Sequence, residues 1–363
     1  MLKMFNRMVE RSLKNFGNPY RILKVMEKAR RGEDVCVVTL GGSITQRFHA
    51  TSIEKCYASL IGAWWKENFP QSNINFVNAG IASTGSLIGI HRLQRDVLDY
   101  NPDFVVVEYS VNDFNRRNID AKETYSNVIH RLLDFGCSVL ALDMTTIGNA
   151  NSQLVHLPIA EYYEIPFVSF YDAVTPEWTA DESLKTKWEA DGTHPTDEGH
   201  KLVADLVCAY LNKLLPQNVN DYAESEAKAP YFTENFQNAT IYYVDDIIPQ
   251  SSGCFAKGET HSTKMERGWK ATTNGEPIVF DLGKCKKVYV LFERTNKGNG
   301  GKAIGDANGR KTEFDSHFED GWGIYANNAL VFEAEKPENV TFTVTPMLEE
   351  GKEFALIAIM VSK

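Results

Sequence analysis

The sequence lacks the features that mark membrane, secreted and zinc-binding proteins. None of its apolar stretches is long enough to span a bilayer. The first residues, MLKMFNRMVERSLKNFGNPYR, interleave basic and apolar residues and lack the apolar run of a signal peptide. The six cysteines are scattered singly, without a C-x-x-C pair, which predicts buried free thiols. These absences favour a reducing cytoplasm.

An excess of basic residues is also missing. The formal net charge is -10, which would repel phosphate backbones and anionic lipid surfaces. We therefore expect no nucleic-acid partner and no membrane partner, and a neutral soluble substrate fits better. Hydrophobic residues make up 43% and charged residues 24% of the 363 positions, the balance of an ordinary globular protein of about two domains. The oligomeric state stays open, and the sequence is compatible with a homo-oligomer.

Residues 1–216 alternate short apolar runs with longer amphipathic ones, which is typical of βαβ units. Val, Ile, Leu and Phe are concentrated in five runs, as expected for strands covered on both faces. The five predicted strands are Val35–Leu40, Ile74–Asn78, Phe104–Tyr109, Ser138–Asp143 and Phe167–Phe170. We predict a flavodoxin-like three-layer α/β/α sandwich with a five-stranded parallel sheet.

A different pattern follows Pro216. The stretch QNVNDYAESEAKAP is polar, acidic and poor in large apolar residues, which predicts a linker over residues 217–228. From residue 229 to 363 the apolar runs are short, rich in β-branched and aromatic residues, and separated by Gly, Asn and Pro. This second domain is predicted to be an antiparallel, jelly-roll-like β-sandwich.

Two local patterns carry residues suited to ester hydrolysis. In VCVVTLGGSITQ, a buried strand ends in two glycines directly before Ser43, so its hydroxyl is expected at the carboxyl edge of the sheet, where ligands bind in such folds. In DGTHPTDEGH, Asp191 and His194 stand three residues apart in a turn. There the carboxylate can bond one imidazole nitrogen and leave the other free as a base. Thr196 is predicted to cap the helix that follows.

Two further segments end predicted strands at the same edge. VVVEYSVNDF places Asn112 there, and its side-chain amide could stabilise the oxyanion of a tetrahedral intermediate. NAGIASTGS, from Asn78 to Ser86, could supply a backbone N–H for the same purpose.

The four motifs Gly-Gly-Ser-Ile-Thr, Asn-Ala-Gly, Val-Asn-Asp and Asp-x-x-His-Pro occur in the order of the SGNH, or GDSL-like, hydrolase superfamily, which the first domain resembles. The resemblance implies that Ser43 is the nucleophile, with its own N–H in the oxyanion hole, and that Asn112 is the side-chain donor. It also implies that His194 is the general base and that Asp191 orients this histidine.

The sequence departs from the family pattern twice. The usual Gly-Asp-Ser-Leu reads Gly-Gly-Ser-Ile here, which leaves the triad intact because that aspartate is not a member of it. The family's oxyanion glycine normally lies five residues after the Asn of the second block, and this spacing reaches Ser83. Since the donor is a backbone N–H, Ser83 can supply it, with Gly80 and Gly85 as alternatives.

Other titratable residues receive a structural interpretation. The remaining histidines have no metal-ligand spacing, so we expect no metal and no cofactor, and we expect these side chains to be structural or at the surface. They are His49, His91, His130, His156, His200, His261 and His317. Glu108 and Asp113 could form the carboxylate pair of a glycosidase, but Glu108 lies inside a predicted strand rather than beyond its end.

The two-domain order gives a hint about the substrate. An SGNH domain followed by a β-sandwich resembles the carbohydrate acetylesterases that deacetylate mannan oligosaccharides, and the sandwich resembles a carbohydrate-binding module. The resemblance implies an acetylated hemicellulose oligosaccharide, from mannan or xylan, as substrate. Trp322, in EDGWGIYANN, could stack on a sugar ring or belong to the core. A general or lipid carboxylesterase is the main alternative, and a non-catalytic sugar-binding protein is a further one.

Overall fold

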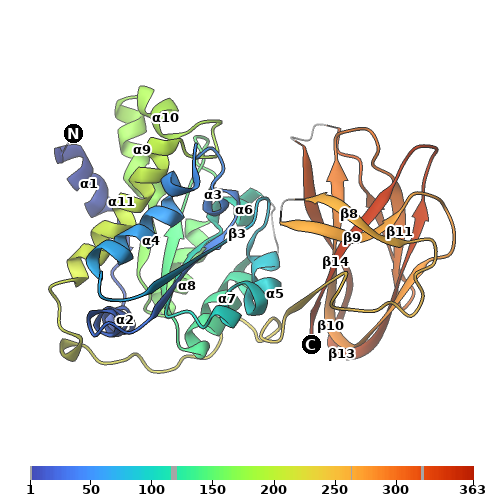
Figure 1. Cartoon of the computed structure of the whole chain (residues 1–363), viewed down its shortest axis with the longest axis horizontal. Helices are drawn as coiled ribbons and strands as arrows, with labels where there is room; N and C mark the ends of the chain where they lie inside the picture. The colour runs from blue at the N-terminus through green and yellow to red at the C-terminus, as the bar shows by residue number, and fades with distance from the viewer. Residues whose placement is uncertain (1, 116–120, 263, 320–322) are drawn as a thin grey trace. The chain divides into compact units, whose positions relative to one another are not determined.

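The computed structural model describes residues 2–115, 121–262, 264–319 and 323–363. The chain forms two compact units, Met1–Glu234 and Asn235–Lys363, which are treated separately below (Figure 1).

The first unit contains a six-stranded sheet in the order β1-β6-β5-β4-β2-β3. Its strands are β1 (Leu13–Asn15), β2 (Val35–Gly41), β3 (Ile74–Gly80), β4 (Phe104–Glu108), β5 (Ser138–Asp143) and β6 (Phe167–Ser169). Strands β2 to β6 are parallel, which confirms the predicted flavodoxin-like sheet. The short edge strand β1 pairs antiparallel with β6 and has no counterpart in the prediction.

The sheet is covered on both faces, which explains why its strands are apolar at successive positions. Val35 and Val37 of β2 belong to one core cluster together with residues of α4 and α11, whereas Val38 points to the opposite face. Helices α5 and α7 pack against each other, and they contact β2 and β5 respectively. The helices that contribute to the core cluster with Val35 and Val37 are α1 (Leu2–Ser12), α2 (Tyr20–Arg30), α4 (Tyr57–Asn68), α9 (Phe170–Ala180), α10 (Ser183–Trp188) and α11 (Asp197–Leu214). The helices that contribute no residue to this cluster are α5 (Ser86–Asp96), α7 (Ala121–Phe135) and α8 (Gln153–Tyr162).

Several short helices complete the first unit. Helix α3 (Ser43–Gln46) follows β2, and helix α6 (Ser110–Asn115) follows β4. Single 3-10 turns lie at Ile53–Lys55, Leu98–Tyr100 and Val219–Asp221. Strand β3 pairs with one side of β2, and the next strand, β4, pairs with the other side, so the strand order reverses at β2. Such a switch point is where ligands bind in folds of this kind.

The predicted linker is fastened to the surface of the first unit. The amide of Asn18 donates to the Ala223 carbonyl at 2.8 Å, and the Lys228 ammonium forms an ion pair with Glu164 at 2.9 Å. The backbone N–H of Tyr231 donates to the Tyr163 hydroxyl at 2.9 Å. The segment after α11 therefore lies along the first unit up to its end at Glu234.

The second unit is an antiparallel sheet of eight strands that curls around its own core, in agreement with the predicted all-β domain. Its order is β12-β11-β13-β10-β14-β9-β8, with β7 also paired to β14. The strands are β7 (Thr240–Tyr243), β8 (Ala256–Ser262), β9 (Met265–Ala271), β10 (Ile278–Thr295), β11 (Lys302–Ala307), β12 (Arg310–Asp315), β13 (Ile324–Met347) and β14 (Phe354–Ser362). Register shifts along the β10–β13 pair bend these long strands, so one hydrogen-bonded sheet encloses the core.

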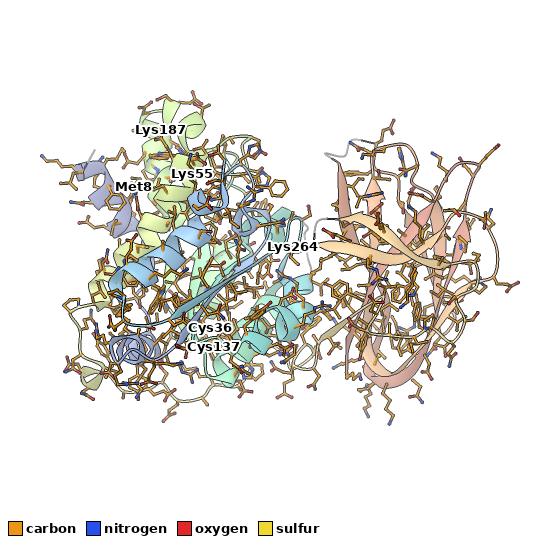
Figure 2. All side chains as sticks on the ribbon, in the orientation of Figure 1. Met8, Cys36, Lys55, Cys137, Lys187 and Lys264 are labelled. Carbon is orange, nitrogen blue, oxygen red and sulfur yellow. The ribbon has the colours of Figure 1, made fainter. Side chains whose placement is uncertain are left out.

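All six cysteines are free, as predicted, and four of them are buried. Figure 2 marks Cys36 and Cys137 in the first unit, where burial raises the pKa of the Cys36 thiol to about 11 and that of Cys137 to about 12. Within the residues that the structure describes, no helix combines the length and apolar character needed to cross a membrane.

Candidate active site

The turn from β2 into α3 positions Ser43. Strand β2 ends at Gly41, Gly42 precedes the helix, and Ser43 is its first residue, 9% exposed. A Cβ on Gly41 would lie 2.6 Å from the Glu108 carbonyl oxygen, and one on Gly42 would lie 2.9 Å from Oδ1 of Asn112. Close approach of Thr45 in α3 and of β4 therefore leaves no room for a side chain at Gly41, and the Asn112 side chain in α6 limits the room at Gly42; neither glycine has a left-handed backbone.

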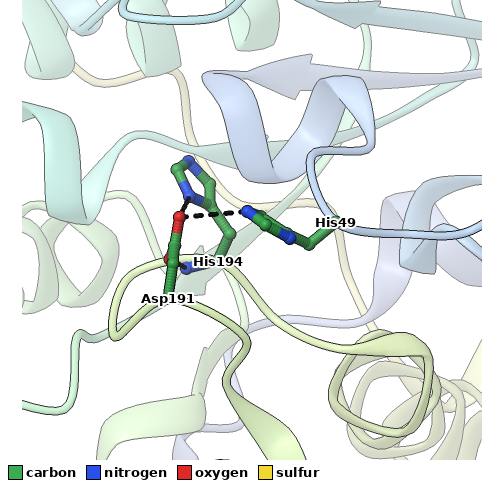
Figure 3. Close-up of side chains that lie close together, drawn as sticks. All are labelled: His49, Asp191 and His194. Carbon is green, nitrogen blue, oxygen red and sulfur yellow. Dashed lines mark hydrogen bonds and ion pairs between the residues drawn. The ribbon is translucent and has the colours of Figure 1, made fainter. Parts of the chain in front are cut away.

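Ser43, His194 and Asp191 form one hydrogen-bonded row. Ser43 Oγ lies 2.9 Å from His194 Nε2, although the two residues are 151 positions apart. His194 Nδ1 lies 2.8 Å from Asp191 Oδ2 (Figure 3). A ring that donates from Nδ1 to the carboxylate presents its Nε2 lone pair to the serine hydroxyl, which is the arrangement that a general base requires.

The loop before α11 forms the histidine and aspartate geometry locally. Asp191 Oδ1 accepts hydrogen bonds from the backbone N–H groups of Thr193 at 2.9 Å and His194 at 2.8 Å. Gly192, which follows Asp191 in this turn, has a φ of +86°. Thr196 caps α11 by accepting the N–H of Gly199 at 3.1 Å, as predicted. The carboxylate is thus fixed by backbone donors on one oxygen and is free to orient His194 with the other.

These contacts keep Asp191 ionised. Partial burial alone would raise the pKa of the Asp191 carboxyl, but the hydrogen bonds from the His194 ring and from the N–H groups of His194 and Thr193 outweigh it. They lower the pKa to about 2. The carboxylate is therefore negative at any pH at which an esterase works.

The candidate oxyanion donors come from the ends of the neighbouring strands. Asn112, in α6 after β4, places its side-chain amide against Gly42, the residue before Ser43. Gly80, at the end of β3, is paired in register with Gly41, but its N–H donates to Asn78 Oδ1 at 2.9 Å. Ser83 lies three residues further on, in the loop before α5, with a φ of +59°.

Glu108 and Asp113 are buried behind this edge. Glu108 is 1% exposed and accepts the N–H and the hydroxyl of Ser110, and burial raises the pKa of its carboxyl to about 7. Asp113 is 3% exposed; it accepts the N–H of Ser86 at 2.8 Å and lies 3.1 Å from His156 Nε2. Two carboxylates enclosed in this way cannot flank a sugar, so the glycosidase alternative has no support in the geometry.

Two residues near the site belong to none of the sequence motifs described above. His49 was expected to be structural or at the surface; its Nε2 lies 3.1 Å from Oδ2 of Asp191. Arg92 is fully buried and donates to the carbonyl of Gly41 at 3.1 Å and to the Tyr109 hydroxyl at 3.0 Å, which fixes the end of β2. Only their positions hinted at a role, since His49 follows Ser43 closely and Arg92 lies on the apolar face of its helix.

Among the described residues, three side chains lie close together although their spacing in the sequence does not predict it. His49, Asp191 and His194 each offer a metal-ligating atom, and these atoms lie within 4.8 Å of one another. Spacing along the chain gives no sign of this group, because His49 and Asp191 lie far apart in the sequence. Trp322, the predicted sugar-stacking residue, lies outside the described residues.

Comparison with known proteins places the first unit in a family. Residues 39–202 match the GDSL-like Lipase/Acylhydrolase family. The first unit is a GDSL-like lipase/acylhydrolase domain, and the protein is a carboxylic ester hydrolase.

Relatives of this GDSL-type esterase fall into two groups. The arylesterase of Vibrio mimicus is 25% identical over 191 residues, which are 49% of this chain and 89% of the relative. Thioesterase 1/protease 1/lysophospholipase L1 of Escherichia coli (strain K12) is 21% identical and covers 55% of this chain and 97% of its own length. By contrast, the crystal structure of a two-domain esterase active on acetylated mannans matches 98% of both chains, with 28% identity and a TM-score of 0.90. The same esterase co-crystallised with mannopentaose matches with a TM-score of 0.88.

Proposed function

We propose that this GDSL-type esterase removes O-acetyl groups from acetylated hemicellulose oligosaccharides, with mannan as the first candidate, through a Ser43–His194–Asp191 triad. The observation that carries the mechanism is the continuous row of hydrogen bonds, 2.9 Å from Ser43 to His194 and 2.8 Å from His194 to Asp191.

The reaction needs two acyl transfers. His194 Nε2 takes the hydroxyl proton as Ser43 Oγ attacks the acetyl carbonyl, and the ionised Asp191 stabilises the imidazolium that forms. When the tetrahedral intermediate collapses, the bond to the sugar oxygen breaks and the imidazolium gives its proton to that oxygen, so the sugar leaves as an alcohol and an acetyl group stays on Ser43. A water molecule then attacks this acetyl ester with His194 as base again, and acetate leaves.

The oxyanion of each intermediate requires preorganised donors. We assign this role to the N–H of Ser43, the side-chain amide of Asn112 and the N–H of Ser83. The amide of Asn112 lies against Gly42, next to the nucleophile, which supports its assignment. Gly80 is a poor alternative because its N–H is already bonded to Asn78. Each such donor is worth about 3 kcal/mol in comparable sites.

The substrate class rests on similarity along the whole chain. The two-domain esterase active on acetylated mannans resembles both units of this protein, whereas the arylesterase and the thioesterase/lysophospholipase match about half of the chain. An additional domain that accompanies the hydrolase domain in both proteins favours a shared kind of substrate. We propose that the second unit contributes to sugar recognition and that Trp322 stacks on a sugar ring.

The alternative is a general or lipid esterase of the GDSL type, which the similarity to the arylesterase and to the thioesterase/lysophospholipase favours. Such an enzyme would have no need of the second unit for catalysis, and it would accept long acyl chains.

The experiment is deacetylation of acetylated manno-, xylo- and chito-oligosaccharides, followed by mass spectrometry. We expect loss of acetyl groups from manno-oligosaccharides with the native protein. Ser43→Ala should reduce the rate by several orders of magnitude while the circular-dichroism spectrum stays unchanged. An active Ser43→Ala variant would remove the mechanism, and an enzyme active on none of the three sugars would remove the substrate class.

A further inference from the structure

The side chain of His49 converges on the carboxylate that orients His194. Figure 3 shows His49 and His194 both directed at one oxygen of Asp191. The distances to Asp191 Oδ2 are 3.1 Å from His49 Nε2 and 2.8 Å from His194 Nδ1. The two imidazole ring centroids are 5.7 Å apart. The proposed mechanism uses only one of these two histidines.

The spacing of the three ligand atoms is close to that of a tetrahedral metal site. Ligand atoms about 2.0–2.1 Å from a shared Zn²⁺ ion lie roughly 3.4 Å apart. The two nitrogen-to-oxygen distances fall just below this value, and all three atoms lie within 4.8 Å of one another. Room for an ion between the three atoms requires both imidazole rings to move outward from Asp191 by roughly half an ångström or less, and water could complete its coordination.

The group is also accessible and held in place. The His49 side chain is 45% exposed, that of Asp191 40% and that of His194 17%. The backbone on both sides of His49 is anchored to α11, since the Phe48 carbonyl accepts from His200 Nε2 at 3.0 Å and the Thr51 N–H donates to Asp197 at 2.8 Å. An ion can thus enter from solvent and meet ligands whose positions are already restricted.

We propose that His49, Asp191 and His194 form a binding site for a divalent transition-metal ion such as Zn²⁺, and that the bound ion switches the esterase off. The inference rests on the proposed triad. The ion would take the Nδ1 lone pair of His194 and displace the hydrogen bond to Asp191. A neutral ring coordinated through Nδ1 carries its proton on Nε2, the atom that faces Ser43. That nitrogen then donates a hydrogen bond instead of accepting one, so it cannot take the serine proton.

Binding is tested apart from catalysis, with the full chain carrying Ser43→Ala, because Ser43 is not a ligand. Titration with Zn²⁺ against a chromophoric chelator should give one site per chain, and Co²⁺ should give the visible absorption of a tetrahedral site. Adding His49→Gln should weaken binding at least about tenfold, as expected for loss of one of three protein ligands. His261→Gln, at an exposed histidine of the second unit, is the matched control and should bind as the parent does.

Inhibition is then measured on nitrophenyl acetate, with each variant compared to its own rate without metal. Zn²⁺ should inhibit the native enzyme reversibly, EDTA should restore the rate, and His49→Gln should need at least about ten times more Zn²⁺ for half-inhibition. Equal binding by the His49→Gln and His261→Gln proteins would overturn the proposed site. Metal binding that depends on His49 but leaves the esterase rate unchanged would overturn the switch. Failure of the triad would be seen separately, as activity of Ser43→Ala without metal.

Discussion

Replacing Gly42 by alanine tests whether the Asn112 amide acts in the oxyanion hole. The new Cβ would lie 2.9 Å from Oδ1 of Asn112 and 3.2 Å from its Cγ, whereas ordinary contact begins near 3.4 Å. The amide would have to move by about half an ångström. Because a misplacement of about 1 Å can cost on the order of 10²-fold in rate, we expect kcat to fall by about tenfold.

The melting temperature should change little, because the group that must move is the end of a partly exposed side chain rather than packed backbone. The assay is steady-state hydrolysis of nitrophenyl acetate together with thermal unfolding. Gly148→Ala is the matched control, since its Cβ would meet only the Thr146 hydroxyl at 3.7 Å. That variant should keep the native kcat.

A double-mutant cycle separates the amide from any other effect of the methyl group. Asn112→Ala alone should lower kcat by about 10²–10³-fold, as the loss of one oxyanion donor does. Adding Gly42→Ala to that variant should then change kcat little, because no amide remains to be displaced. The reasoning is refuted if Gly42→Ala costs the same factor with and without the Asn112 amide.

Three further predictions follow from the site and the proposed substrate. As a carbohydrate acetylesterase, the enzyme should prefer nitrophenyl acetate over the butyrate and longer esters by at least about tenfold, and a preference that rises with chain length would instead support the lipid-esterase alternative. Trp322→Ala should slow turnover of acetylated oligosaccharides several-fold, the equivalent of about 0.5–1.5 kcal/mol of stacking, and leave nitrophenyl acetate hydrolysis unchanged; equal losses on both would make Trp322 a core residue. Burial, together with the nearby charge of Asp191, raises the pKa of the Glu189 carboxyl from 4.5 to about 8. Between these two pH values the folded protein keeps a proton that the unfolded chain has released, so the free energy of unfolding falls as the pH rises. Glu189→Gln should therefore raise the melting temperature by a few degrees at pH 8 and by less at pH 5, and a gain that is the same at both values would contradict this origin.

Much of the site could be predicted because its parts are local. Asp191, Thr193 and His194 form their turn through hydrogen bonds that span two or three residues, and the Thr196 cap spans three, so the residue types suffice to predict them. The five parallel strands could be predicted for a related reason: burial on both faces requires nearly continuous apolar runs, and such runs are visible in the sequence. The antiparallel second unit could be predicted from runs of β-branched and aromatic residues between turn residues.

Other features depend on contacts that no local pattern encodes. Strand β1 has only three residues, Leu13–Asn15, and becomes a strand because β6 offers a free edge. The sequence pattern predicts a sandwich of two sheets in the second unit, whereas the structure has one sheet that curls around the core. Bulges along the long pair β10 and β13 bend both strands and make this curl possible.

Contacts between distant segments also decide the geometry of the candidate active site. Space at Gly42 is limited because α6 brings the Asn112 side chain within contact distance, and the N–H of Gly80 already donates to Asn78. His49 reaches Asp191 only because α11 anchors its loop. The sequence by itself determined which side chains stand at the ends of which strands, since that depends on local periodicity and turn chemistry. Only the tertiary structure decided which of them meet, because contacts between distant segments depend on how the packed helices and strands fix their distances.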